Sequence, residues 1–275
     1  MVGRASLPPT APCRGILDFR PWGLQSLDSL GRVVPRSAIW SSPPALDQIA
    51  EWRPVLGAVA GILLGRTHFF DLGRLVVGEN QTTINDPAKG DKGFTPEVFT
   101  TQVTKKFEAE TGLSWSKLED SSVPPQAKRL LPELLAVQQA VIKDRQSLIN
   151  LMGVGFKGFI PASFGTTVSL RFRRESGAYL KQTAATVRNR RNTPDEHETA
   201  TLKTFASEEY PHGKTLAETV DDGQNIRVMV PLYYKDHCLV CHGGPKGELD
   251  KTGHAKEGGQ LGQLGGAISV RLEVP

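Results

Sequence analysis

A short run near the C-terminal end carries the residues best suited to chemistry. Cys238, Cys241 and His242 form the pattern Cys-x-x-Cys-His. Two thiols three positions apart can reach the two vinyl groups on one side of a porphyrin, and the imidazole that follows can ligate the iron. The spacing therefore predicts one covalently attached haem c, with Cys238 and Cys241 as thioether anchors and His242 as the proximal iron ligand.

A structural zinc site is the alternative interpretation of the same run. Its two cysteines and its last histidine would then take three positions around the metal, and His237 or His254 would take the fourth. Zinc sites usually separate their ligand pairs by a longer stretch of chain, whereas here a histidine directly follows the second cysteine. The pattern therefore favours haem over zinc.

The composition limits the classes of protein and partner. The chain has 39% hydrophobic and 23% charged residues, which is typical of a globular protein. Its net charge of +4 is mild, so we expect no nucleic-acid partner. The third cysteine, Cys13, is expected to be a free thiol rather than part of a disulfide framework. The sequence contains no nucleophile with a neighbouring base and no phosphate-binding glycine loop, so we expect no enzymatic activity.

The N-terminal quarter of the chain has the composition of a leader. Residues 1–53 are rich in Pro, Ser and Arg without periodicity, which predicts a disordered leader or an extension upstream of the true start. Residues 54–76 are expected to be signal-like or anchor-like, because the apolar run at 54–65 suits a signal-peptide core or a short membrane anchor. A buried start to the first helix is the alternative. Since haem c is attached on the outer side of a cytoplasmic membrane, we expect a periplasmic or extracytoplasmic protein, with or without this anchor.

An internal repeat follows the leader. Residues 77–112 align without a gap with residues 142–177, and thirteen of the 36 positions are identical, against roughly two expected from average composition. Each copy contains a Gln-x-x-Ile-Asn helix end, a Lys-Gly-Phe turn and a proline that opens a second helix. The sequence thus predicts a duplicated helix–turn–helix segment. Its first copy, within residues 77–140, has no haem motif and is expected to be a haem-free helical extension.

The remainder of the chain is predicted to form a small sheet. Thr193 and Pro194 are expected to begin a helix that ends near residue 207. Strands are predicted at 216–220 and 226–233, around an Asp-Gly turn, and at 267–274. Apolar residues alternate with other residues along 226–233, which indicates a strand with one face in the core. The predicted fold class is therefore α+β, with residues 141–275 as the haem-binding domain.

Several segments resemble the Tll-like haem-c domains, a family on a PAS-like fold regarded as extracytoplasmic redox or small-ligand sensors. The resemblance is carried by residues 155–162, 187–198, 238–243 and 265–270. It implies a PAS-like antiparallel sheet with flanking helices, and a haem held in the PAS-like cavity.

The resemblance also directs attention to residues around the haem. Some relatives supply the sixth iron ligand from a cysteine on an early helix, but this chain has no cysteine between Cys13 and Cys238. We expect His68 as the distal ligand, or an open position. The remaining candidates are Met152, His212, Met229 and His254. Arg188 opens one of the matching segments and is expected to bind haem, because a guanidinium group can pair with a propionate.

Two functions suit a single haem of this kind. The first is a sensor, in which a change of iron oxidation or a bound small gaseous ligand alters the domain and a redox or signalling partner responds. The second is a periplasmic electron-transfer cytochrome c. A zinc-stabilised interaction module is the third alternative.

Overall fold

A computed structural model describes residues 69–221 and 224–273 of the chain. The predictions for the leader at 1–53, the apolar run at 54–65, Cys13 and His68 concern residues outside those described. In the described part, no helix combines the length and the apolar character needed to cross a membrane.

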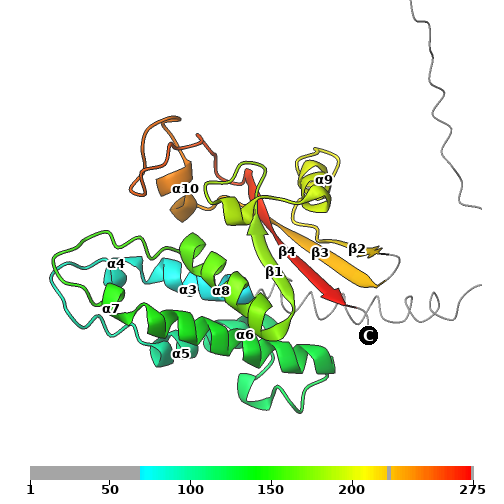
Figure 1. Cartoon of the computed structure of the whole chain (residues 1–275), viewed down its shortest axis with the longest axis horizontal. Coiled ribbons are helices and arrows are strands. Elements are labelled where there is room, and N and C mark those ends of the chain that lie inside the picture. Colours follow the sequence, from blue (N-terminus) through cyan, green and yellow to red (C-terminus); the bar gives the residue numbers. More distant parts are fainter. Residues whose placement is uncertain (1–68, 222–223, 274–275) are drawn as a thin grey trace, which may run out of the picture. The chain divides into compact units, whose positions relative to one another are not determined.

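Within residues 69–176, the α-helices that precede the sheet fall into two sets of three (Figure 1). The first set is α3 (Phe69–Glu79), α4 (Gln81–Ile84) and α5 (Pro96–Thr111), and the second is α6 (Pro125–Asp144), α7 (Gln146–Ile149) and α8 (Pro161–Ser176). A short 3-10 helix, η1 (Trp115–Lys117), lies between them. The bounds of α7 and α8 are those of α4 and α5 shifted by 65 residues. Both α5 and α8 begin with a proline and end at a left-handed glycine, Gly112 or Gly177, where a side chain would be strained.

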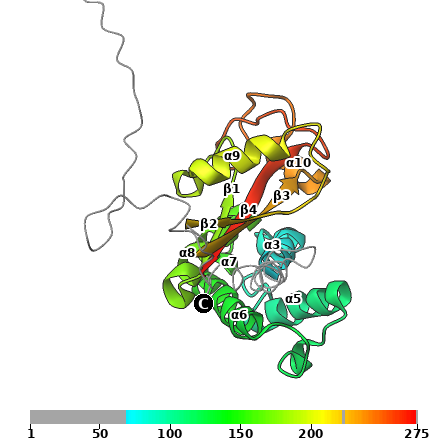
Figure 2. The same ribbon diagram turned by 90° about the vertical axis from the view of Figure 1, so that its right-hand side faces the viewer.

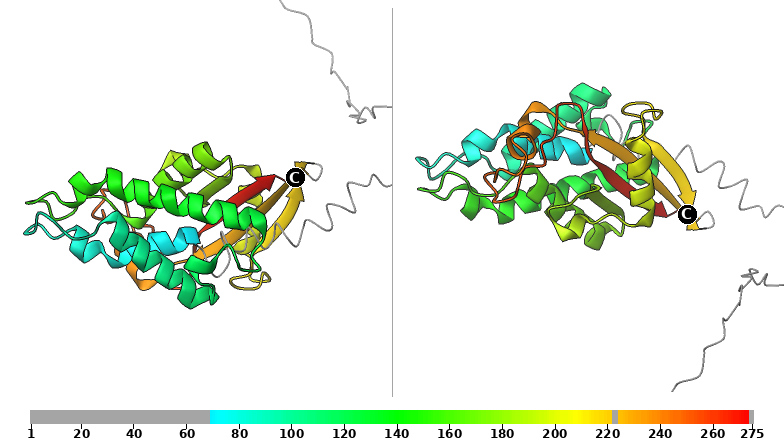
Figure 3. Two further views of the ribbon diagram at one scale, coloured as in Figure 1. Left: turned by 90° about the horizontal axis from the view of Figure 1, so that it is seen from below. Right: turned by 90° about the horizontal axis from the view of Figure 1, so that it is seen from above.

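The two sets of helices bind each other through matched hydrogen bonds. Four of the bonds between them form two matched pairs, in each of which the two sets exchange roles, as at a two-fold interface. The loops between α4 and α5 and between α7 and α8 accordingly lie at the same end (Figure 3). The bonds are Gln81 Nε2 to Phe159 O (2.9 Å), Gln146 Nε2 to Phe94 O (3.0 Å), Lys157 N to Asn85 Oδ1 (3.0 Å) and Lys92 N to Asn150 Oδ1 (3.1 Å).

The sheet has four antiparallel strands in the order β1-β4-β3-β2. These strands are β1 (Tyr179–Thr183), β2 (Leu216–Val220), β3 (Asn225–Tyr233) and β4 (Leu264–Glu273). One face of the sheet packs on α3, α6 and α8 and contributes to the larger cluster of core residues. The opposite face packs on α9 (Glu196–Phe205) (Figure 2). The remaining elements are η2 (Arg190–Asn192) and α10 (Asp236–His242), the latter in the long connection between the adjacent strands β3 and β4. The prediction of an α+β fold with an antiparallel sheet and flanking helices is confirmed.

Three sequence-based expectations need correction. β3 is buried on both faces rather than one, because it is a central strand and α9 covers the side that carries Arg227 and Met229. The helix predicted to have Thr193 as its N-cap and Pro194 as its first residue begins at Glu196. Asp195 is its N-cap, since its carboxylate accepts the Glu198 N–H and the Glu198 carboxylate accepts the Asp195 N–H. The last strand begins at Leu264 rather than at residue 267.

The helices and the sheet share one hydrophobic core. Phe99 of α5 and Phe164 of α8 lie in the same cluster of buried side chains as Val228 of β3. The boundary expected between residues 140 and 141 lies inside α6. The helical segment at 77–140 therefore packs as part of the same compact unit as the sheet.

Candidate functional site

The Cys-x-x-Cys-His run forms α10, which begins three residues after β3 ends. Asp236 lies in its first turn, where a negative charge favours the helix dipole. Gly243 follows its last residue, and a Cβ there would lie 2.5 Å from the carbonyl oxygen of Leu239. Glycine therefore lets the chain turn tightly at this point. Cys238 and Cys241 lie one turn apart on the same side of the helix, and both are half-buried.

The imidazole of His242 is held on two sides. Its Nδ1 lies 2.9 Å from Oε2 of Glu257, and its ring stacks on Tyr234 with a centroid distance of 5.2 Å. The Tyr234 ring itself fills a slot between two glycines, since a Cβ at Gly259 or Gly265 would approach it to 2.5 or 2.6 Å. Because Nδ1 faces Glu257, Nε2 is the nitrogen that a metal ion would use. The side chain is 34% exposed.

Arg188 connects α10 to the glycine-rich loop that follows it. Its Nε and Nη2 donate to the two Glu257 oxygens at 2.7 and 2.9 Å, and its Nη1 donates to Asp250 Oδ2 at 2.5 Å. Nη2 also donates to the carbonyl oxygen of Cys241 at 2.8 Å. The sequence thus placed Arg188 in the site, but its guanidinium group binds the protein's own acids and backbone. Its expected contact with a propionate stays a prediction.

Asp250 organises the loop after α10. Its buried carboxylate accepts from Arg188, from the backbone N–H groups of Thr252 and His254, and from the Thr252 hydroxyl. Burial alone would raise its pKa, but these hydrogen bonds outweigh burial and hold the pKa well below its usual value. Burial and the neighbouring Asp250 carboxylate raise the pKa of the Cys241 thiol.

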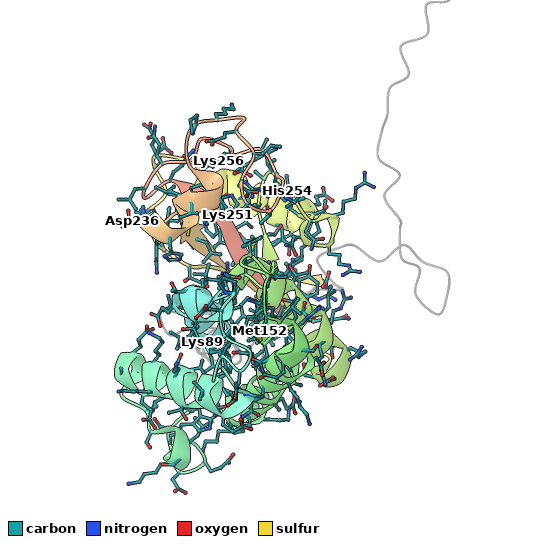
Figure 4. The ribbon with its side chains drawn as sticks, turned by 90° about the vertical axis from the view of Figure 1, so that its left-hand side faces the viewer. Lys89, Met152, Asp236, Lys251, His254 and Lys256 are labelled. Carbon is teal, nitrogen blue, oxygen red and sulfur yellow. The ribbon has the colours of Figure 1, made fainter. Side chains whose placement is uncertain are left out.

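The remaining candidates for a distal ligand lie on several elements. Met229 is fully buried under α9, where it packs as a core residue, and His212 stacks on Tyr233 at 3.8 Å. His254 lies on the loop after α10 and its Nδ1 contacts the Thr252 hydroxyl at 3.0 Å. Met152 lies 60% exposed on the α7–α8 loop (Figure 4). In the described ranges, no three His, Cys, Asp or Glu side chains gather as a metal-binding group.

Glu257, Tyr234 and Asp250 are the residues of the site that the sequence did not indicate. Glu257 lies fifteen positions after His242, within a loop that has no periodicity. Tyr234 simply follows the end of a strand. The one sequence feature that could have indicated them is the high glycine content of residues 243–266. Glycine has no Cβ, so it lets the backbone pass close to an aromatic ring such as that of Tyr234.

Fold and site define a class of α+β domain in which a four-stranded antiparallel sheet, flanked by helices, presents a Cys-x-x-Cys-His helix in the connection between its last two strands. A family model described as Tll0287-like matches residues 116–273. This is more than half of the chain, which therefore belongs to the Tll0287-like family, as its sequence resemblance predicted. No curated protein matches the chain. One similar solved structure is described as the crystal structure of the cyanobacterial heme-protein Tll0287, with 16% identity, a TM-score of 0.39, and coverage of 55% of this chain and 97% of that chain.

Proposed function

We propose that the chain is a haem-binding domain that carries a single haem c. Cys238 and Cys241 would hold the porphyrin through thioether bonds, and His242 would ligate the iron. One observation carries the proposal. The His242 ring is fixed through Nδ1 by Glu257, and it lies partly exposed beside two half-buried sulfurs on the same helix. Membership of a family named after a protein described as a heme-protein supports it.

The residues around α10 fit such a group. Neither cysteine is engaged in a disulfide, and the second ring nitrogen of His242 is held by a carboxylate, as is usual for a metal-ligating histidine. We place the porphyrin against the half-exposed side of α10. Two cavities over the helices, near Gln102 and near Ser163, have no lining residue from α10. When bound, the group would supply one-electron chemistry and an iron that binds small ligands.

We propose that the sheet has a PAS-like fold and that the helices arose by duplication of one segment. The matched hydrogen bonds between the two sets of helices support the duplication, because copies of one segment can pair symmetrically. The first copy has no Cys-x-x-Cys-His run, so its proposed role is structural.

The preferred role is that of a periplasmic or extracytoplasmic sensor without catalytic activity, whose iron responds to redox state or to a small gaseous ligand. The family resemblance supports this role. The sixth iron position is left to His68 or to an exchangeable ligand, because no cysteine precedes α10 except Cys13. A redox or signalling protein would respond to the change in iron oxidation or ligand binding.

An electron-transfer cytochrome is the second candidate, and the exposure of α10 favours it. Val240, between the two cysteines, is 57% exposed, so a porphyrin bound there would present an edge to a partner protein. The two roles differ in the distal ligand. A carrier keeps two strong ligands, whereas a sensor has a weak or exchangeable one.

Haem attachment is tested by producing the full chain in a host competent for cytochrome c maturation. We expect a band that stains for haem on a denaturing gel, and its loss in the C238S/C241S double variant. The C13S variant is the matched control and should stain like the wild type. A colourless wild-type band without iron would overturn the proposal, and bound zinc in that protein would support the interaction module instead.

The two roles are separated by spectra of the reduced protein. Rapid changes on addition of carbon monoxide or nitric oxide support the sensor. Spectra that stay unchanged with both gases favour the electron carrier.

A further inference from the structure

The contact between His242 and Glu257 sets the electronic character of the imidazole. A ligating histidine donates its second N–H to a carboxylate, a backbone carbonyl or water, and this partner tunes the basicity of the ring. A carboxylate draws the Nδ1 proton more strongly than a neutral carbonyl does, because the hydrogen bond is charge-assisted. The ring then becomes a stronger donor and stabilises the more positively charged, oxidised iron.

The Glu257 carboxylate is held in place by a positively charged neighbour. Arg188 binds both of its oxygens, a paired geometry that fixes the plane of the carboxylate. Arg188 does not cancel the negative charge, because it also pairs with the buried Asp250. Glu257, Asp250 and Arg188 together carry a net charge of −1.

We propose that Glu257 is a positioning residue that lowers the midpoint potential of the haem through Nδ1 of His242, and that Arg188 fixes it for this role. The inference rests on the proposed haem attachment. It adds a residue that acts through His242 rather than as an iron ligand. It predicts that the haem stays oxidised at potentials at which a haem whose histidine bonds to a carbonyl would be reduced. In either role, this contact would determine which partners can reduce the protein.

The test is a spectroelectrochemical titration of the haem-loaded full chain and its E257Q variant. Gln keeps an oxygen that can accept from Nδ1 but removes the charge. We expect E257Q to stain for haem like the wild type and to show a higher midpoint potential. The control is E248Q, which removes the same charge from the same loop, where Glu248 pairs with Lys256 at 3.0 Å and is 55% exposed.

A shift in E257Q no larger than that in E248Q, with haem content intact, would overturn the inference and leave haem attachment standing. A wild-type chain without haem would instead overturn the proposed function. Should E257Q fail to mature, proton NMR of the wild-type haem protein decides the point. We expect an Nδ1 proton of His242 that exchanges slowly with heavy water, since it is held between the ring and Glu257. Rapid exchange would contradict the inference.

Discussion

At the scale of single residues, the orientation of His242 depends on neighbours that carry no charge. Gly259 and Gly265 leave room for the Tyr234 ring, and that ring stacks on the imidazole. A methyl group at either glycine would have to displace the aromatic ring or the backbone. The orientation of the proposed iron ligand therefore depends on glycines whose lack of a side chain leaves room for the Tyr234 ring.

We expect the variant G259A to lose about 1–3 kcal/mol of stability, because its Cβ would overpack the Tyr234 slot. We also expect less haem per chain, since the imidazole would no longer be held. Urea unfolding and the ratio of haem absorbance to protein measure the two effects. G155A is the control, because a Cβ at Gly155 meets no atom within 4 Å. Equal stability and haem content in G259A and G155A would contradict the prediction.

Asp250 gives the site a predictable response to acid. Its pKa in the folded chain lies below the unfolded value of 3.8, so its stabilising effect is fully present above that value. The effect is lost as the pH falls through it toward the folded pKa. We expect D250N to be less stable than the wild type by on the order of 2 kcal/mol at neutral pH. This gap should narrow as the pH falls below about 4 in urea unfolding. A gap that stays constant with pH would contradict the assignment, and D236N, at an exposed acid of α10, is the control.

Local spacing predicted the residues of α10, but it did not predict their partners. Two cysteines and a histidine within five positions form a pattern because one helical turn presents them together. Glu257 reaches His242 only because Arg188, from the segment after β1, and Asp250 hold its loop in place. Such contacts join distant parts of the chain, and no periodicity of one segment encodes them.

At the scale of elements, α9 is attached to the sheet by buried charges. Glu198 is fully buried on α9 and accepts hydrogen bonds from Lys181 of β1 at 2.7 Å and from Arg227 of β3 at 3.1 Å. The Tyr179 hydroxyl also lies 3.2 Å from Glu198. One carboxylate thus joins two strands to the helix that covers them.

We expect the variant E198A to destabilise the protein by about 3–5 kcal/mol, because the partly buried Lys181 would lose its counter-charge and the buried Arg227 would keep only Asp195. The matched control is E196A, an exposed acid in the first turn of the same helix, for which we expect a change below about 1 kcal/mol. Thermal or urea unfolding measures both variants. Equal stability of the two variants would show that the buried pairs contribute little.

The ends of these elements were predictable where short-range chemistry determines them. The Asp-Gly pair predicted the β2–β3 hairpin within one residue of the observed strand bounds, because this dipeptide strongly favours a tight turn between two strands. The start of α9 was misplaced by two residues, because its N-cap is Asp195 and not Thr193. Thr193 and Asp195 are both good N-caps, and the choice between them depends on Arg227, which binds the Asp195 carboxylate at 2.7 Å.

At the scale of the whole molecule, the two sets of helices and the sheet form a single packed body. α8 contacts β1, α3 contacts α8, and the aromatic rings of Phe99 and Phe164 meet at 5.7 Å between the two sets. Removal of residues 77–112 would delete α4 and α5 and expose this core. The first set of helices therefore stabilises the part of the fold that carries the site, even though α10 lies far from it in the sequence. The repeat was visible in the sequence, whereas its symmetric pairing depends on tertiary contacts that an alignment of two segments does not specify.

Because of this shared core, we expect a core substitution far from α10 to destabilise the proposed haem site. Phe99 is fully buried, so we expect F99A to lose about 3–5 kcal/mol of stability. Because helices and sheet share one core, helical circular dichroism and the haem absorbance should decline together in urea, at the same lowered midpoint. The neighbouring V98A removes a partly exposed side chain from the same helix and should leave the midpoint nearly unchanged. If the helical signal of F99A were lost while the haem absorbance kept its wild-type midpoint, the helices and the sheet would be separate folding units.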